Sequence, residues 1–168
     1  GTARTAVFNW LFAHKQKGVF IVRIDDTDKE RSKKEFEEDI LEGFRWLGLE
    51  WDELHRQSER PKIYESYLKR LLEEGKAFWC PHTKKELEAE AKRQRATHES
   101  PRHRCSTRDR KREGGELIRL RIPLGEKICF NDVVRGNICF EPDLLGDVSL
   151  AKDLQTPLYN FTTVVDDH

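Results

Sequence analysis

Three carboxylates follow a short apolar segment near the start of the chain. Asp25, Asp26 and Asp28 come directly after the β-prone run "VFIVRI", residues 19–24. In a parallel α/β sheet, ligands bind outside the carboxyl ends of the strands. A carboxylate there can accept hydrogen bonds from an ammonium group or a sugar hydroxyl, or bind Mg²⁺ through water. The alternative is structural: Asp26 and Asp28 accept hydrogen bonds from the turn and the backbone amides after it.

A second group of reactive side chains lies further along the chain. Cys80 and His82 form a C-x-H pair, and His103 and Cys105 form an H-x-C pair. All four residues are of types that bind zinc, and a tetrahedral Cys₂His₂ site is chemically reasonable. A bound ion would add folding energy to a loop-rich segment with little core. The alternative is a segment that keeps these side chains but has lost the metal.

The acidic turn needs a strand to present it, and the surrounding sequence predicts one between helices. Residues 2–16 carry apolar side chains at helical spacing. Residues 19–24 have the composition of a strand buried on both faces, which is typical of a parallel sheet under helices. Ser32 and Glu35 form a capping-box signature for a helix through about residue 47. The run "PKIYESYLKRLLEEG" predicts another helix.

The character of the chain changes after Gly75. The run "KAFWC" predicts a strand, and Thr83 with Glu86 forms a capping box for a charged surface helix over about 84–95. Residues 96–115 have little apolar content and should form a loop. From residue 116 the pattern has a period of two, which predicts an antiparallel unit from "ELIRLRIP", "KICFNDVV", "NICFE" and "DVSLAKD". The final run "TPLYNFTTVVDDH" predicts a helix that returns to the first domain.

Composition limits the class of protein. Hydrophobic residues make up 36% and charged residues 37% of the 168 residues, and no apolar run is long enough to span a membrane. Features of a signal peptide are missing at the start. Four cysteines do not suggest a disulfide framework, so we predict a cytoplasmic protein. We expect Cys129 and Cys139 to be small buried hydrophobic residues outside any metal site.

The zero net charge hides a basic segment. Residues 92–112 contain nine Lys or Arg against Glu99 and Asp109, an excess of seven positive charges. Such a segment is either a solvated loop or a contact for a polyanion.

Four stretches together resemble the glutamyl-tRNA synthetases, a family of class I aminoacyl-tRNA synthetases. They are "GTARTAVFNWLFAHKQKGVFIVRIDDTDKERS", "ILEGFRWLGLEWDE", "QSERPKIYESYLKRLLEEGKAF" and "TPLYNFTTVVDDH". The resemblance covers nearly the whole chain in order. It implies an α/β fold, in which an incomplete Rossmann-type parallel sheet carries an α+β connective insertion. It also implies an ATP-dependent ligase that activates glutamate and transfers it to the tRNA 3′ end.

The resemblance also implies a domain organisation. Residues 1–75 would be the N-terminal half of the catalytic domain, without its first strand. Residues 76–155 would be the insertion that holds the tRNA acceptor end, and residues 156–168 would return to the catalytic domain. The implied partners are tRNA, glutamate and ATP with Mg²⁺, for a protein that we expect to be a monomer without membrane contact.

Individual residues follow from the same resemblance. Asp25 occupies the position whose acidic residue contacts the substrate α-amino group, although the family usually has Glu there. Tyr159 matches a tyrosine that lines the glutamate pocket. Thr27 and Asp28 are implied to contact tRNA, and we expect the same of three arginines in the basic segment, Arg102, Arg104 and Arg108.

Zinc is found at the corresponding place in some bacterial members of the family. Cys80, His82 and Cys105 can be laid on their pattern, but the fourth position falls on Thr107, which is not a ligand. His103 or His98 would have to replace it.

Two family motifs are missing from the chain. The nucleotide-binding motif of the HIGH type should precede Gly1, and the KMSKS-type loop should follow His168. We therefore expect an internal, inactive piece of a longer protein, with no catalytic residue within it. The alternatives are the shortened paralogue that glutamylates a modified tRNA base, and a non-catalytic RNA-binding or zinc-stapled module. The runs "RIDDTD" and "WLGLEWDE" favour the full synthetase over the paralogue.

Overall fold

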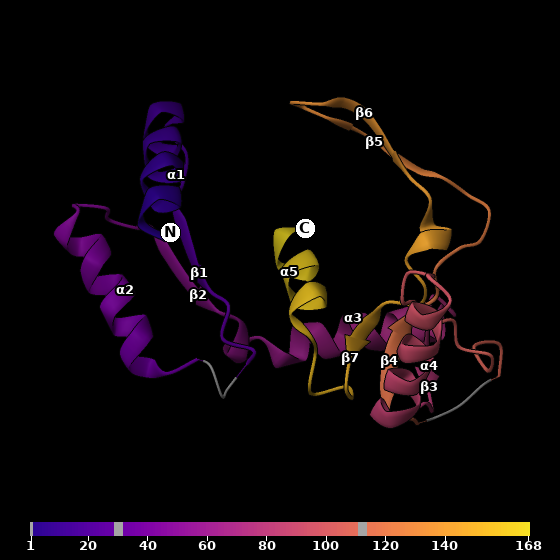
Figure 1. The fold of residues 1–168 in the computed structure, drawn as a ribbon. Helices are drawn as coiled ribbons and strands as arrows, with labels where there is room; N and C mark the ends of the chain where they lie inside the picture. Colours follow the sequence, from indigo (N-terminus) through magenta and orange to yellow (C-terminus); the bar gives the residue numbers. More distant parts are fainter. Residues whose placement is uncertain (1, 29–31, 111–113) are drawn as a thin grey trace. The chain divides into compact units, whose positions relative to one another are not determined.

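The computed structural model describes residues 2–28, 32–110 and 114–168 and divides the chain into two compact units. The first unit consists of residues 1–61 and 162–168, and the second of residues 62–161. Figure 1 shows the elements of both. Within the described ranges, no helix is long and apolar enough to cross a membrane.

The first unit is built on two parallel strands. Its elements are α1 (Thr2–Gln16), β1 (Ile21–Ile24), α2 (Lys34–Trp46), β2 (Glu53–Arg56) and the C-terminal part of α5 (Tyr159–Asp167). Strands β1 and β2 pair in parallel, with Val22 opposite Leu54, and α2 lies between them in the chain. Parallel neighbours need a crossover of this kind. The predicted parallel sheet is therefore present, but β2 itself was not predicted from the sequence.

The core of the first unit lies between the strands and the two helices. Its buried side chains are Ala6 and Ala13 of α1, Phe20 and Val22 around β1, Leu41 and Phe44 of α2, and Leu49. Asp52 joins the starts of the two strands, because its carboxylate accepts a hydrogen bond from the Phe20 amide at 2.7 Å. The local order of helix, strand, helix and strand thus brings the two strand ends to one edge of the sheet.

Two predictions for this unit are wrong in detail. Helix α2 begins at Lys34 after Lys33, which makes no side-chain capping bond, so the Ser32 and Glu35 box does not form. The segment 19–24 is not buried on both faces, since Val19 and Ile21 are 58% and 52% exposed. Successive side chains of a strand point to opposite faces. Phe20 and Val22 face the core, which leaves their neighbours on the exposed face.

The second unit combines helices with an antiparallel sheet. It holds α3 (Pro61–Glu73) from its second residue onward, α4 (Lys84–Ala96), and three strands in the order β3 (Ala77–Cys80), β4 (Leu117–Leu120) and β7 (Ser149–Ala151). The predicted capping box of α4 is confirmed: Glu86 N–H donates to Thr83 Oγ1, and Thr83 N–H donates to Glu86 Oε2 at 2.7 Å. Helix α4 buries none of its residues, as its charged composition predicts.

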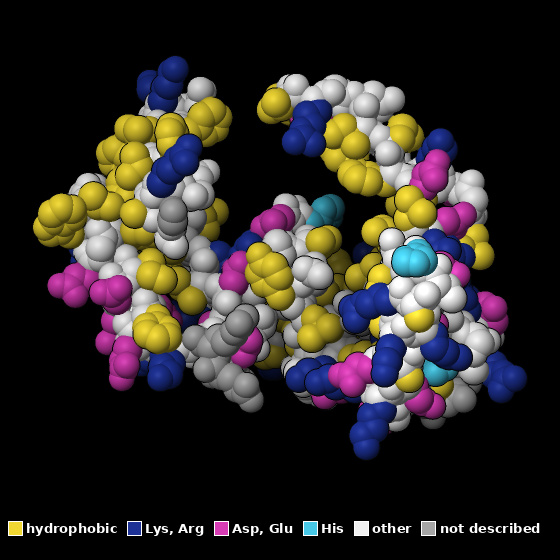
Figure 2. Space-filling view, viewed as in Figure 1, with side chains coloured by type: hydrophobic (Ala, Val, Ile, Leu, Met, Phe, Trp, Pro, Cys, Tyr) yellow, Lys and Arg dark blue, Asp and Glu magenta, His cyan; other side chains and the backbone are white. Residues whose placement is uncertain are grey.

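The second unit also contains a hairpin of two strands, β5 (Ile128–Asp132) and β6 (Gly136–Phe140). Cys129 and Cys139 lie directly opposite each other and form a disulfide. Both are exposed, so the prediction that they are buried hydrophobic residues is wrong. Opposed residues of an antiparallel pair are close enough for such a bond. Figure 2 shows many hydrophobic side chains along this hairpin, and Val133 and Val134 at its turn are almost fully exposed.

Candidate functional site

Two carboxylates of the acidic turn have different partners. Asp25 Oδ1 accepts a hydrogen bond from Arg23 Nε at 2.6 Å. Asp26 instead accepts from the backbone N–H of Ser58 at 2.9 Å and from its hydroxyl at 2.6 Å. Asp26 follows β1, and Ser58 follows β2. Asp26 therefore joins the carboxyl ends of the two parallel strands, a structural role in which its partner is Ser58 and not the amides of its own turn.

A cavity of about 590 Å³ lies beside this turn. It is lined by β1, the acidic turn and one face of α2, including Arg23, Asp25, Phe36 and Ile40. Its volume is in the usual range for a small-molecule site. The carboxyl end of β1 thus opens on a space that combines apolar walls with charged groups.

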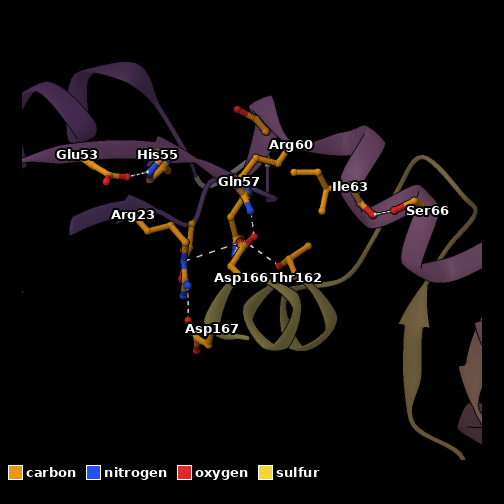
Figure 3. A network of polar contacts seen from close by, with 12 residues as sticks. Arg23, Glu53, His55, Gln57, Arg60, Ile63, Ser66, Thr162, Asp166 and Asp167 are labelled. Carbon is orange, nitrogen blue, oxygen red and sulfur yellow. Dashed lines mark hydrogen bonds and ion pairs between the residues drawn. The ribbon is translucent and has the colours of Figure 1, made fainter. Parts of the chain in front are cut away.

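Arg23 links the acidic turn to the end of α5. Besides Asp25, it forms an ion pair with Asp167 and lies 4.0 Å from Asp166 Oδ2 (Figure 3). The hydrogen bond that Arg23 donates to Asp25 raises the pKa of the Arg23 guanidinium above its usual range, and the Asp167 carboxylate acts in the same direction. Arg23 is therefore a permanent positive charge between carboxylates from two segments of the chain.

Asp166 anchors a second part of the same network. Its side chain is only 3% exposed, and it accepts hydrogen bonds at 3.0 Å from Arg60 Nε and from Gln57 Nε2. Gln57 is itself buried and accepts a hydrogen bond from the Thr162 hydroxyl at 3.1 Å (Figure 3). These contacts fix the end of α5 next to the acidic turn.

The charges of this network are mostly paired, but Asp25 keeps part of its carboxylate for a ligand. Arg23 and Arg60 stand against three carboxylates, those of Asp25, Asp166 and Asp167. An ionised carboxylate offers about four lone-pair sites. Because Arg23 approaches Oδ1 most closely, Asp25 keeps acceptor capacity for a ligand, and its side chain is 28% exposed. An ammonium group suits this arrangement.

No contact with a substrate group is described for the other predicted substrate and tRNA residues, Tyr159, Thr27 and Asp28. Tyr159 begins α5, is about half exposed and belongs to the second unit, whereas Asp25 belongs to the first. Thr27 is partly exposed and Asp28 is exposed; the carbonyl of Asp28 accepts a hydrogen bond from Ser32 N–H. Their contacts with glutamate or tRNA stay predictions.

The second unit brings the four predicted metal ligands together. Cys80 ends β3, His82 follows it, and His103 and Cys105 come from the loop after α4. Cys80 Sγ lies 3.4 Å from His82 Nδ1 and 3.5 Å from His103 Nε2, and Cys105 Sγ lies 3.6 Å from His82 Nδ1. The four ligand atoms all lie within 4.8 Å of one another, and both cysteines are buried.

These distances fit a tetrahedral zinc ion. With Zn–S near 2.3 Å and Zn–N near 2.0–2.1 Å, the sulfur–nitrogen edge of a tetrahedron is about 3.6 Å. The three sulfur–nitrogen distances of 3.4, 3.5 and 3.6 Å agree with it. Of the two histidines considered for the fourth position, the described cluster contains His103 and not His98.

Burial affects the thiols of this cluster. Desolvation raises the pKa of the Cys80 thiol, and the neighbouring Cys105 adds to the rise. A thiol that coordinates a divalent cation loses its proton outright. The donor set and its burial therefore suit a bound cation better than two free thiolates.

The three arginines of the basic segment are bonded within the second unit. Arg102 and Arg104 both donate to the carbonyl of Asp143, at 3.2 and 2.7 Å. Arg108 forms an ion pair at 3.3 Å with Asp147, whose side chain is fully buried. Arg108 thus has a structural partner, and contact of the three with tRNA stays a prediction. Lys111 and Arg112 of this segment lie outside the described residues.

Sequence reasoning missed several residues that organise the two sites. It did not single out Arg23, Asp166 or Asp167 in the first unit, or Glu90 and Asp147 in the second. Asp147 accepts a hydrogen bond from the backbone of Cys105 at 2.9 Å. For Asp166 and Asp167, the sequence offered one signal, since they form a pair of acidic residues at the end of the apolar run in "VVDDH".

The fold and the first site are those of an α/β protein with a cavity at the carboxyl end of a strand in a parallel pair. The chain belongs to the family described as "tRNA synthetases class I (E and Q), catalytic domain", whose model matches residues 1–168. The resemblance seen in the sequence is thereby confirmed, and with it the α/β class with a partial Rossmann-type fold.

Relatives and solved structures agree with this membership. The glutamate–tRNA ligases of Carboxydothermus hydrogenoformans and Bacillus subtilis are each 44% identical to the chain, over 99% and 100% of it, and it covers 38% of each. A crystal structure of a glutamate tRNA ligase from Elizabethkingia meningosepticum in complex with its amino acid superposes with a TM-score of 0.86 at 32% identity. It covers all of this chain, which covers 38% of that one. The chain thus spans about two fifths of the length of these relatives.

Proposed function

We propose that the chain is part of a glutamate–tRNA ligase, which activates glutamate with ATP and transfers it to the tRNA 3′ end. The observation that carries this proposal is the acidic end of β1, where Asp25 faces a cavity of suitable size. Support also comes from relatives of that name, 44% identical over nearly the whole chain. The same names favour the ligase over the shortened paralogue and over a non-catalytic RNA-binding module. We further propose a cytoplasmic monomer, in which a reducing environment keeps the exposed Cys129 and Cys139 as thiols and their disulfide forms on oxidation.

Asp25 binds the α-ammonium group of glutamate in this proposal. A hydrogen bond between charged groups contributes about 1.5–3 kcal/mol. Arg23 holds the Asp25 carboxylate in place through Oδ1, and the cluster around it carries more acidic than basic groups. Asp25 is one methylene shorter than the usual glutamate, and its contact with Arg23 fixes where that shorter carboxylate lies. Tyr159 lines the glutamate pocket, and Thr27 and Asp28 contact tRNA.

ATP is a substrate of the whole protein in this proposal. Bound Mg²⁺ would neutralise the phosphate charge of ATP. We assign no residue of this chain to ATP, to Mg²⁺ or to a catalytic step.

The second unit holds the acceptor end of tRNA in this proposal, and residues 76–155 form the insertion. A zinc ion bound by Cys80, His82, His103 and Cys105 would crosslink β3 and the loop after α4. Arg102, Arg104 and Arg108 supply phosphate contacts, which position RNA without reading its sequence.

Glutamate-dependent ATP–pyrophosphate exchange tests the proposal, measured on the full-length protein that contains this chain, with and without tRNA. We expect exchange that depends on tRNA. Exchange without tRNA would favour the shortened paralogue, and no exchange under either condition would leave the binding module.

Replacing Arg102 and Arg104 together should weaken tRNA binding and reduce its salt dependence; an unchanged salt dependence would contradict the phosphate contacts.

The role of Asp25 has a separate test. Asp25→Ala should raise the KM for glutamate about 10- to 100-fold, which corresponds to the loss of one charged hydrogen bond. The KM for ATP should change little. Asp39→Ala is the matched control, because Asp39 is an exposed carboxylate on the neighbouring helix α2. An equal change in the two variants would contradict a contact between Asp25 and glutamate.

A further inference from the structure

His103 lies between the cysteine cluster and a carboxylate of α4. Its Nε2 is 3.5 Å from Cys80 Sγ, and its Nδ1 is 2.6 Å from Glu90 Oε2. The His103 side chain is 11% exposed and that of Glu90 is 28% exposed. The two nitrogens of one ring are thus used in opposite directions, one toward the cluster and one toward Glu90.

The chemistry of imidazole gives this contact a consequence. A neutral imidazole carries its proton on one nitrogen and has a lone pair on the other. A carboxylate next to Nδ1 can only accept a hydrogen bond, so it keeps the proton there and directs the Nε2 lone pair toward the cluster. Carboxylate partners of this kind fix the tautomer and orientation of histidines that bind metals and increase their basicity.

Helix α4 also holds the backbone next to His103. Gln94, one turn after Glu90, forms two hydrogen bonds with the backbone of Arg102. Its Nε2 donates to the Arg102 carbonyl at 2.7 Å, and its Oε1 accepts from the Arg102 N–H at 2.9 Å. The carbonyl of His103 accepts a hydrogen bond from Asp147 N–H at 2.7 Å. The loop therefore approaches the cluster in one fixed position.

We propose that Glu90 is the positioning residue that makes His103 the fourth zinc ligand. The position two residues after Cys105 holds Thr107, which cannot serve as that ligand, and the contact with Glu90 brings in a histidine from two residues before Cys105. This inference depends on the zinc site proposed above.

Metal affinity and the cobalt spectrum test the inference on the full-length protein. Zinc affinity is measured by competition with a chromophoric chelator, and Co²⁺ absorption reports the geometry of the site. Glu90→Ala should lower zinc affinity about 10- to 100-fold, the usual effect of removing such a partner. The Co²⁺ bands should also shift and weaken. Glu90→Gln keeps an acceptor without the charge, so we expect a smaller loss.

The control is Glu88→Ala on the same helix, since Glu88 is exposed and pairs only loosely with Lys84 at 3.9 Å. A double-mutant cycle with His103→Ala separates positioning from general stabilisation. If Glu90 acts through His103, Glu90→Ala should cause no further loss of affinity in the His103→Ala background.

Three results would count against these claims in different ways. If the wild-type protein binds neither zinc nor Co²⁺, the zinc site itself is refuted and the inference with it. If the wild type binds metal and both Glu90 variants behave like Glu88→Ala, only the role of Glu90 is refuted. An equal loss of affinity in the presence and absence of His103 would show that Glu90 acts on the fold and not through the ligand.

Discussion

The acidic end of β1 and the Cys₂His₂ cluster differ in how their polar side chains are paired. At the strand end, charges of both signs satisfy one another: Arg23 pairs with Asp25 and Asp167, and Arg60 pairs with Asp166. In the cluster, four nitrogen and sulfur donors converge within 4.8 Å, and the buried Arg119 is the cationic side chain that acts on Cys80. The first site is thus largely complete from side chains, while the second is a donor set that suits an added cation.

This difference explains how each site can be used. A network of mutually paired charges can keep Asp25 oriented while part of its carboxylate stays available to a ligand. A metal ion in the other site would replace a hydrophobic core in a region where α4 buries none of its residues. We therefore predict that the stability of the first site depends on the balance of its charges and that of the second on bound metal.

Loss of a metal ligand should have the largest effect. Cys105→Ala should reduce bound zinc from about one ion per chain to almost none, because structural zinc contributes about 10–16 kcal/mol of binding energy in small zinc-finger peptides. A chelator should lower the thermal midpoint of the wild type and leave that of the variant unchanged. Metal analysis and a thermal melt measure both. The double variant Cys129→Ser, Cys139→Ser is the control and should keep its zinc; a Cys105 variant that retains zinc would remove the contrast between the sites.

Loss of a buried carboxylate should have the next largest effect, in the first unit. Breaking a buried ion pair costs about 3–5 kcal/mol. Since Arg60 is about one-third exposed, we expect Asp166→Ala to lower the free energy of unfolding by about 2–3 kcal/mol. Urea denaturation measures this change, and a chelator should not alter it. Asp167→Ala is the control, because that carboxylate is mostly exposed; an equal loss in both would contradict the role given to burial.

Removing the disulfide should have a local effect within the second unit. The Cys129–Cys139 bond closes a loop with a sequence separation of 10, and closure of such a loop contributes roughly 2–3 kcal/mol. An isolated two-stranded hairpin is marginally stable at best. The double serine variant should therefore lose amide protection in β5 and β6, measured by hydrogen exchange, while β3 and β4 keep theirs. Loss of protection across the whole unit would show that the hairpin supports the metal cluster.

Removing the cap of α4 should have the smallest effect. Thr83→Ala should cost about 1 kcal/mol of stability, as for other N-caps. Hydrogen bonds from Thr83 lower the pKa of Glu86, first from its backbone and then from its hydroxyl. The contribution of Glu86 is therefore fully present above its ordinary pKa near 4.5 and is lost as the pH falls through the lower pKa of the folded state. Thermal melts of the wild type and of Glu86→Gln should converge at low pH; a constant difference would contradict this contribution.

The sequence pattern predicted most of the helices and strands, because their formation depends largely on residues that are neighbours in the chain. The capping box of Thr83 and Glu86 formed as expected, and the same pattern at Ser32 and Glu35 did not. Strand β2 was not predicted because "ELHR" has a single apolar residue, Leu54, among polar ones, and its parallel pairing with β1 supplies the order instead.

The sequence by itself determined which residue types are present: the carboxylates after β1, the two Cys/His pairs and the capped helix between them. Only the tertiary structure decided how they are used. It joined Asp26 to Ser58, Arg23 to the end of α5, and His103 to both Cys80 and Glu90. It also placed Cys129 opposite Cys139. The physical reason is that these partners are brought together by strand pairing and loop closure, which depend on the path of the whole chain and leave no local pattern.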